Sequence, residues 1–143
     1  MALKTISGSS IVLQVHLTSS SSSPTDVAAS TSGVITINSE TIDITNKNSS
    51  GAKDYMHGVT NWSVDCDAFV LADATGNRSS GFATACNSGT KINVKFYDTS
   101  GQTNSASYEG NGFVTSWTET GSVGEFATYS ATIQGTGALT IST

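Results

Sequence analysis

A segment in the middle of the chain, residues 59–70, alternates between apolar and polar side chains. The apolar members are Trp62, Val64, Cys66 and Ala68, and the polar members between them are Asn61, Ser63, Asp65 and Asp67. An alternation with a period of two places the first set on one face of a β-strand and the second set on the other. The segment therefore predicts a long strand with a buried face and a solvated face that carries two carboxylates.

Short runs rich in β-branched and aromatic residues recur on both sides of this segment. They predict further strands at residues 11–17, 34–37, 41–45, 91–97, 107–118, 127–133 and 138–141. Asn38, Ser39 and Glu40 are expected to form a tight connection between the strands at 34–37 and 41–45. The Gly-Thr-Gly sequence at 135–137 is expected to form a bulge or a bend before the last strand.

One short helix is expected among these strands, at residues 73–87. Asp73 is a suitable N-cap, and Phe82 and Cys86 are four residues apart, so they lie on the same side of a helix. Gly76 and Gly81 weaken it. The serine-rich residues 19–25 are expected to form a flexible loop. Strands on both sides of one helix predict a mainly β (α+β) fold, a β-sandwich with one short flanking helix.

The length of 143 residues favours a single domain, residues 1–143, large enough to bury a core without disulfides. Only 12% of the residues are charged, about half the usual share, and Ser, Thr, Asn and Gly take their place. Such a composition is typical of surfaces made of strands and turns.

The net charge of −5 argues against tight, phosphate-driven binding of nucleic acid. The first residues do not resemble a secretory signal, so Cys66 and Cys86 are expected to be free thiols. No apolar run reaches the length of a membrane span.

A second informative stretch joins an alternating strand to a long polar loop. Ile42 and Ile44 alternate with polar residues and are expected to face the core. The loop that follows, at about 46–58, carries both charges and apolar side chains. Its notable residues are Asn46, Lys47, Lys53, Asp54, Tyr55, Met56 and His57. A strand that leads into such a loop suggests a scaffold that presents an arm to a partner.

No constellation of catalytic or metal-binding residues is found. Asp65 and Asp67 share a strand face and could act as acid and base or hold a cation, but no third ligand stands at a recognisable spacing. His16 and His57 are far apart and lack neighbouring Cys or His ligands. No Gly-x-Ser-x-Gly elbow is present. The sequence therefore predicts a protein that is not an enzyme and has no catalytic residues, metal site or cofactor.

Several segments taken together resemble the major tail proteins of long-tailed bacteriophages, which build the tail tube. They are residues 39–47, 51–59 and 62–64, and, near the C-terminus, residues 113–117 and 129–137. The most specific are the Glu-Thr-Ile-Asp-Ile-Thr block and the final Gln-Gly-Thr-Gly. The resemblance spans most of the chain.

The resemblance implies a structural protein of the virion tail, assembled in the host cytoplasm. In that family six subunits form a ring, their inner strands join into a continuous β-barrel, and the rings stack into a hollow tube that conducts DNA into the host cell. The implied partners are further copies of the chain, a tape measure protein and tail tip and terminator proteins. DNA would pass through the lumen without sequence-specific binding.

The resemblance also assigns expectations to individual residues. The loop at 46–58 is expected to bridge one ring to the next. Asp65, Asp67 and Glu109 are expected to line or rim the channel. Six copies at −5 each would give roughly −30 per ring, a field that repels DNA phosphates.

An alternative reading is a carbohydrate- or cell-surface-binding β-sandwich module. In that case Trp62, Trp117 and Tyr108 would form a stacking platform for sugars. Self-assembly discriminates the two classes, because a binding module is expected to stay monomeric and a tube protein to form rings or tubes.

Overall fold

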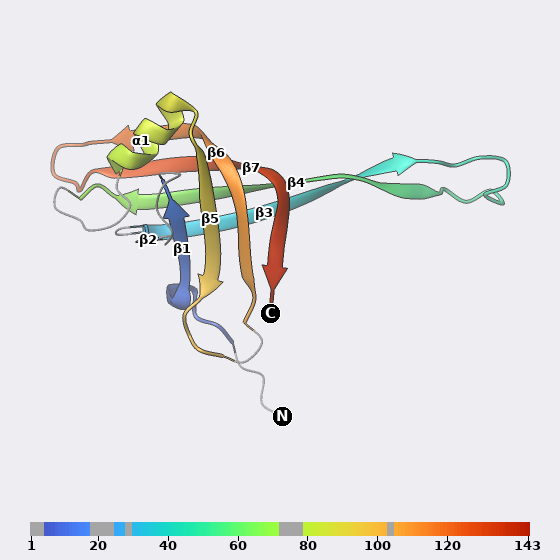
Figure 1. Cartoon of the computed structure of the whole chain (residues 1–143), viewed down its shortest axis with the longest axis horizontal. Coiled ribbons are helices and arrows are strands. Elements are labelled where there is room, and N and C mark those ends of the chain that lie inside the picture. Colours follow the sequence, from blue (N-terminus) through green and yellow to red (C-terminus); the bar gives the residue numbers. More distant parts are fainter. Residues whose placement is uncertain (1–4, 18–24, 28–29, 72–78, 103–104) are drawn as a thin grey trace.

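The computed structural model describes residues 5–17, 25–27, 30–71, 79–102 and 105–143, and within these ranges strands predominate (Figure 1). The elements in chain order are a 3-10 turn η1 (Gly8–Ser10), β1 (Ile11–His16), β2 (Thr25–Asp26), β3 (Ser30–Asp43), β4 (Tyr55–Phe69), α1 (Ser79–Ser88), β5 (Lys91–Asp98), β6 (Ser107–Thr120) and β7 (Thr128–Ser142). The strands form one antiparallel sheet in the order β2-β1-β5-β6-β7-β4-β3. The predicted serine-rich loop and the N-cap Asp73 lie outside the described residues, apart from Thr25, the first residue of β2.

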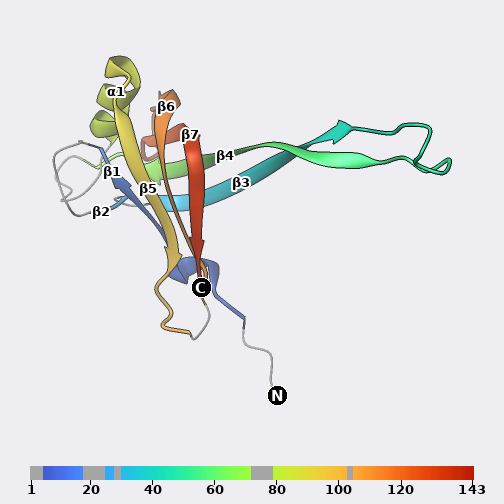
Figure 2. The same cartoon turned by 45° about the vertical axis from the view of Figure 1, so that its right-hand side comes forward.

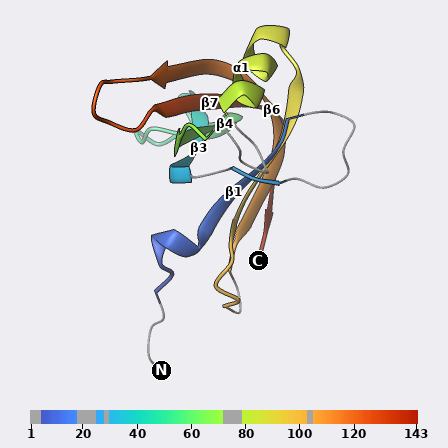
Figure 3. The same cartoon turned by 90° about the vertical axis from the view of Figure 1, so that its left-hand side faces the viewer.

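This single sheet folds back on itself and so has two halves. Strands β6 and β7 are long enough to take part in both. The first part of β6, up to Phe113, pairs with β5, and the first part of β7, up to Gln134, pairs with β4. Both strands turn between these parts, so that β7 runs first beside β4 and then beside the start of β6 (Figures 1 and 3). The predicted mainly β fold with one helix is confirmed, and its two layers are the two halves of one continuous sheet.

The bend lies where Trp62 covers two glycines. A Cβ atom on Gly110 would lie 2.5 Å from the Trp62 ring, and one on Gly135 would lie 2.1 Å from it. The register between β6 and β7 shifts at this point, and Gly137 takes a φ of 76°. The indole Nε1 of Trp62 donates a hydrogen bond to the Gly137 carbonyl at 3.2 Å. The bend predicted at 135–137 is therefore confirmed, and only glycine leaves room for the ring that fixes it.

The core is formed by alternate residues of the strands and by one side of the helix. The apolar face predicted for residues 59–70 is buried as expected, and its polar face is outside. The buried apolar side chains are Leu13, Val15, Val27, Trp62, Val64, Cys66, Ala68, Phe82, Ala85, Ile92, Val94, Val114, Tyr129, Ala131 and Ile133. Cys66 and Cys86 are free thiols, and burial, helped by the charge of Asp67, raises the pKa of Cys66 to about 12.

The helix α1 is held by packing at its centre and by polar contacts at its start. Phe82 lies against the Tyr129 ring, with centroids 5.7 Å apart. The helix ends in a left-handed glycine, Gly89 with φ of 67°, and the Thr90 amide bonds back to the Ala85 carbonyl. At the other end, the Ser79 hydroxyl donates to the Glu119 carboxylate at 2.5 Å and accepts from the Trp117 indole at 3.1 Å. These last contacts fix the helix to β6.

Two predictions about the stretch 34–45 are wrong. Residues 34–37 and 41–45 are not separate strands, because β3 is continuous and residues 38–40 pass through it in extended form. A bulge, and not a turn, lies there, between the pairs Ser39–Thr60 and Thr41–His57. Ile42 and Ile44 do not face the core, and their exposed fractions are 48% and 41%. The strand predicted at 138–141 is likewise the end of β7.

We expect the Gly135→Ala variant to be destabilised by about 1–3 kcal/mol, because the added methyl group overlaps the Trp62 ring. The matched control is Gly121→Ala, whose Cβ would have no atom within 4 Å and should change stability by less than about 0.5 kcal/mol. Urea denaturation followed by tryptophan fluorescence measures both. Equal stabilities of the two variants would show that the Trp62 contact does not fix the bend.

Candidate functional site

The most conspicuous feature of the molecule is a hairpin arm that leaves the body. Pairing of β4 with β7 ends at Ser63, whereas pairing of β4 with β3 continues to Tyr55. The segment beyond the Ser39–Thr60 pair, residues 40–59, is called the arm below. It extends well away from the other elements in two views (Figures 1 and 2). Among the described residues, no strand other than its own two pairs with it.

The tip of the arm is ordered by its own side chains. The Asp43 carboxylate accepts a hydrogen bond from the Thr45 amide at 2.9 Å and forms an exposed ion pair with Lys53 at 3.4 Å. The bonds from Thr45 hold the pKa of Asp43 below its usual value. Thr45 Oγ1 accepts from the Asp54 amide, and Asn46 Oδ1 accepts from the Asn48 amide. The loop thus has a defined shape before it meets any partner.

The predicted loop residues all lie on the arm, in two structural settings. Asn46, Lys47, Lys53 and Asp54 lie in the connecting loop, and Tyr55, Met56 and His57 form the start of β4. Exposed apolar side chains gather on the same arm. They are Ile42, Ile44, Tyr55, Met56 and Val59. Exposed apolar side chains gathered in one region are a common feature of protein interaction sites.

A second feature is a pair of unpaired strand edges on one half of the sheet. This half consists of β3, β4, the first part of β7 and the last part of β6. No described strand pairs with the outer edge of β3 or with the outer edge of β6 beyond Phe113. Long open edges are templates for pairing with another chain, so proteins normally shorten or cover them. Here both are left open.

The outward surface of this half, called the polar face below, is covered mainly with hydroxyl and amide groups. Its central members are Val34, Thr36, Asn38, Asn61, Ser63, Asp65, Asp67, Ser130, Thr132, Ser116, Thr118 and Thr120, and Phe69 and Phe113 lie at its borders. Asp65 accepts a hydrogen bond from Thr132 Oγ1 at 2.8 Å, and Asp67 accepts one from Ser130 Oγ at 2.5 Å. The two predicted carboxylates are therefore exposed neighbours, and each accepts a hydrogen bond from its own hydroxyl donor on β7.

None of the described residues that form the polar face carries a positive charge. Of the lysines in the described residues, Lys47 and Lys53 lie on the arm, and Lys91 and Lys95 lie on β5. Lys91 is opposite Phe113, at the border of this half. The third predicted carboxylate, Glu109, lies in the other half of the sheet, beyond the bend, opposite Lys95. The structure thus brings Asp65 and Asp67 together and separates Glu109 from them.

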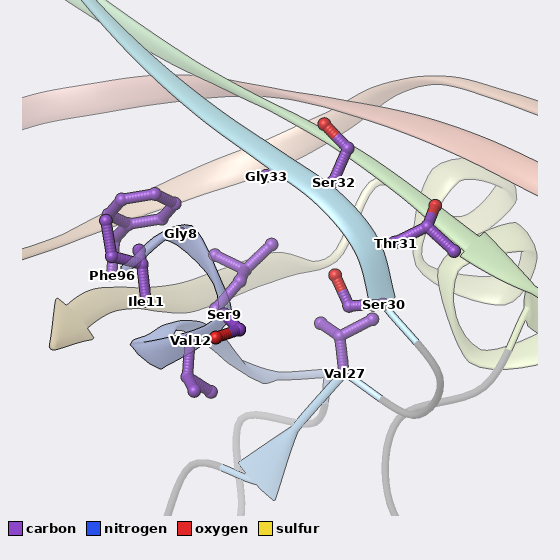
Figure 4. A pocket seen from close by; sticks show the side chains of 11 residues that line it. Gly8, Ser9, Ile11, Val12, Val27, Ser30, Thr31, Ser32, Gly33 and Phe96 are labelled. Carbon is purple, nitrogen blue, oxygen red and sulfur yellow. The ribbon is translucent and has the colours of Figure 1, made fainter. Parts of the chain in front are cut away.

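The structure also shows a half-open cavity of about 700 Å³ between the start of β3 and β1 (Figure 4). Its lining residues are Gly8, Ser9, Ile11, Val12, Leu13, Val27, Ser30, Thr31, Ser32, Gly33 and Phe96. None of them has an ionisable side chain, so the cavity offers no acid, base or metal ligand.

The other chemical candidates do not gather into a site. Within the described ranges, no three His, Cys, Asp or Glu side chains lie close enough to hold a metal ion, and His16 and His57 are on β1 and on the arm. No described helix is long and apolar enough to cross a membrane. The sugar-stacking platform is not formed either, because Trp62 is only 2% exposed. The indole of Trp117 donates a hydrogen bond to the Ser79 hydroxyl and packs against the core.

Sequence reasoning overlooked two apolar side chains in the β6–β7 turn. Val123 is fully exposed and Phe126 is 85% exposed. The sequence signal that could have identified them is the presence of Val123 and Phe126 around Gly124. Large apolar residues are unusual in a turn, which is expected to contact water.

Comparisons with known proteins give one family model and several solved structures. A family model described as phage tail tube protein matches residues 5–141. The tail of an empty gene transfer agent particle, refined with C6 symmetry, has a TM-score of 0.79 and 20% identity over 97% of this chain and 100% of that chain. The SPP1 tail tube has a TM-score of 0.75 and 14% identity over 93% of this chain and 77% of that chain.

A third solved structure, the sheath–tube complex of an extracellular contractile injection system, has a TM-score of 0.68 and 15% identity over 96% of this chain and 91% of that chain. A search of curated proteins gave no match. At such low identities, the solved structures establish the fold that this chain shares with them.

We expect that shortening the arm leaves the body folded. Replacing residues 40–59 by Asn-Gly would join Ser39 to Thr60 through the two-residue turn that antiparallel strands favour. Because the arm pairs only with itself, the free energy of unfolding should change by less than about 1 kcal/mol. Urea denaturation reports on this through Trp62 and Trp117, which both lie in the body. Loss of the cooperative transition would contradict it.

Proposed function

The chain belongs to the phage tail tube protein family, and from this premise we propose that six copies close into a ring and that such rings stack into the hollow tail tube. Membership makes it a structural component of the tail tube. The number of subunits in the ring is taken from the C6 symmetry of the gene transfer agent tail, which has the same fold.

The observation that carries the proposal is the pair of open edges on one half of the sheet. The half has an even number of strands, and neighbouring strands are antiparallel, so its edge strands β3 and β6 run in opposite directions. When identical subunits are arranged around a rotation axis, β3 of one copy meets β6 of the next in the antiparallel sense. Repetition of this contact closes a continuous barrel and leaves no open edge.

The orientation of the barrel wall follows from what covers its two faces. The side of this half that faces the core of the subunit packs against the second half of the sheet and α1. The polar face has no covering element among the described residues, so it is the face that can line a lumen. Asp65 and Asp67 then project into the channel, together with rows of hydroxyl groups.

Such a lining suits the passage of DNA. The carboxylates repel phosphates, and the absence of lysine from the face removes the groups that would bind them. Hydroxyl and amide groups keep the wall hydrated without a fixed charge. DNA can therefore slide through into the host cell without sequence-specific contacts.

The arm is proposed to connect successive rings, because among the described strands it pairs only with itself and it has exposed apolar residues. The residues proposed for this contact are Asn46, Lys47, Lys53, Asp54, Tyr55, Met56 and His57. A tape measure protein inside the tube and terminator and tip proteins at its ends are the further proposed partners, with assembly in the host cytoplasm and residence in the virion tail.

The direct test is electron microscopy of the purified protein at high concentration. Regular tubes with a central channel are expected from the wild type, and none from the variant with the arm replaced by Asn-Gly. A wild-type protein that stays monomeric at every concentration, and in the presence of a tail tip complex, would refute the proposed function.

Reversing a lumen charge should make the tube retain DNA. We expect tubes of Asp65→Lys to bind a short labelled duplex at low salt, with retention falling at least about tenfold between roughly 50 and 200 mM salt. Co-sedimentation of the duplex with the tubes measures this. The control is Asp98→Lys, which makes the same change in net charge at the end of β5, in the other half of the sheet. Equal retention by both variants would place Asp65 outside the lumen.

A further inference from the structure

The end of the molecule opposite the arm has an apolar surface of its own. Phe69 and Leu71 at the end of β4 and Val123 and Phe126 in the β6–β7 turn are all exposed. The rings of Phe69 and Phe126 lie edge to face with centroids 6.1 Å apart, and the Val70 amide bonds to the Ala127 carbonyl. These four side chains are called the rim patch below. Phe69 and Phe126 form its centre, and Leu71 and Val123 lie two and three positions from them along the chain.

Strand β4 connects the arm to the rim patch. It begins at Tyr55 in the arm and ends at Phe69 in the patch, and its 15 residues span about 45–50 Å. The β6–β7 turn and the arm tip accordingly lie at opposite ends of the long axis (Figure 1). In a stack of identical rings every subunit points the same way, so an arm that leaves one ring reaches the opposite end of the next.

The two surfaces are complementary in chemistry. The arm presents exposed Ile42, Met56 and Val59. Of its two lysines, Lys53 is paired with Asp43 within the arm, and Lys47 lies in the connecting loop. The rim patch presents exposed aromatic and aliphatic side chains beside Glu125, which is also exposed, and residues 105–143 contain no lysine or arginine. Apolar groups on both sides can be buried against each other, and Lys47 of one side can pair with Glu125 of the other.

We propose that the rim patch is the receiving surface for the arm of a second copy in the adjoining ring. This inference rests on the proposed function and adds the partner surface that the arm requires. The contact is heterologous, so it repeats without closing and produces a tube. Each tube then ends in uncovered arms on one side and uncovered rim patches on the other, two chemically different ends for two different sets of end proteins.

The test uses variants that remove one side of the contact at a time. Val123→Ser/Phe126→Ser removes the two most exposed side chains of the rim patch, and Ile42→Ser/Met56→Ser removes a cross-strand pair of apolar side chains from the arm. Each is expected to give single rings and no tubes in electron micrographs and mass photometry. Ile141→Ser, at an exposed apolar residue at the end of β7, is the matched control and should form tubes. Val123→Asp serves as a second rim variant whose side chain is fully exposed and so cannot disturb folding.

Mixing the two kinds of ring identifies the partners. Rings of the rim variant keep intact arms, and rings of the arm variant keep intact rim patches. The first can therefore bind the second, but the resulting pair has no further intact surface, so the mixture should give pairs of stacked rings and nothing longer. Absence of pairs would overturn the inference. Rim variants that stack into tubes as the wild type does, or that remain monomers, would also overturn the inference. A wild type that forms neither rings nor tubes would instead refute the proposed function.

Discussion

The contact between Trp62 and the glycines at the bend determines the form of the whole molecule. Gly110 and Gly135 lack the side chains that would exclude the indole, and the bond from its Nε1 to the Gly137 carbonyl fixes the ring in place. With this ring between them, β6 and β7 turn and divide one sheet into two halves. The second half and α1 then cover the inward side of the first. The polar face and the two open edges exist because this division leaves one half of the sheet uncovered on one side.

Strand β4 carries most of the functional surfaces along its length. Its first residues form one side of the arm, Trp62 occupies the bend, Asp65 and Asp67 lie on the polar face, and Phe69 belongs to the rim patch. Because β4 is a single extended strand, the distances between these surfaces are fixed by backbone geometry. The proposed lumen lining and the two proposed axial surfaces are therefore held at fixed spacings by one strand. A protein that must repeat itself over a long tube benefits from such rigidity, since small errors in each contact accumulate along the stack.

Much of the fold could be predicted from local patterns. The alternation at residues 59–70, the helix around Phe82 and the bend at Gly135 to Gly137 depend on spacing and on residue types that act within a few positions. Ile42 and Ile44 show where such reasoning ends. Their alternation correctly indicates a strand, but burial requires a second layer over that strand, and the body of the protein ends before it reaches them.

The sequence by itself determined most of the strands, the acidic and lysine-free segments and the loop that became the tip of the arm, because these are properties of neighbouring residues and of composition. The family was indicated by the resemblance of particular segments to known tail proteins. The tertiary structure decided which surfaces these residues form. The hydroxyl partners of Asp65 and Asp67 come from β7, more than sixty positions away. Likewise, Phe126 meets Phe69 only after β4 and β7 have paired. Such contacts depend on strand order and register, and these are fixed when the whole sheet closes around its core.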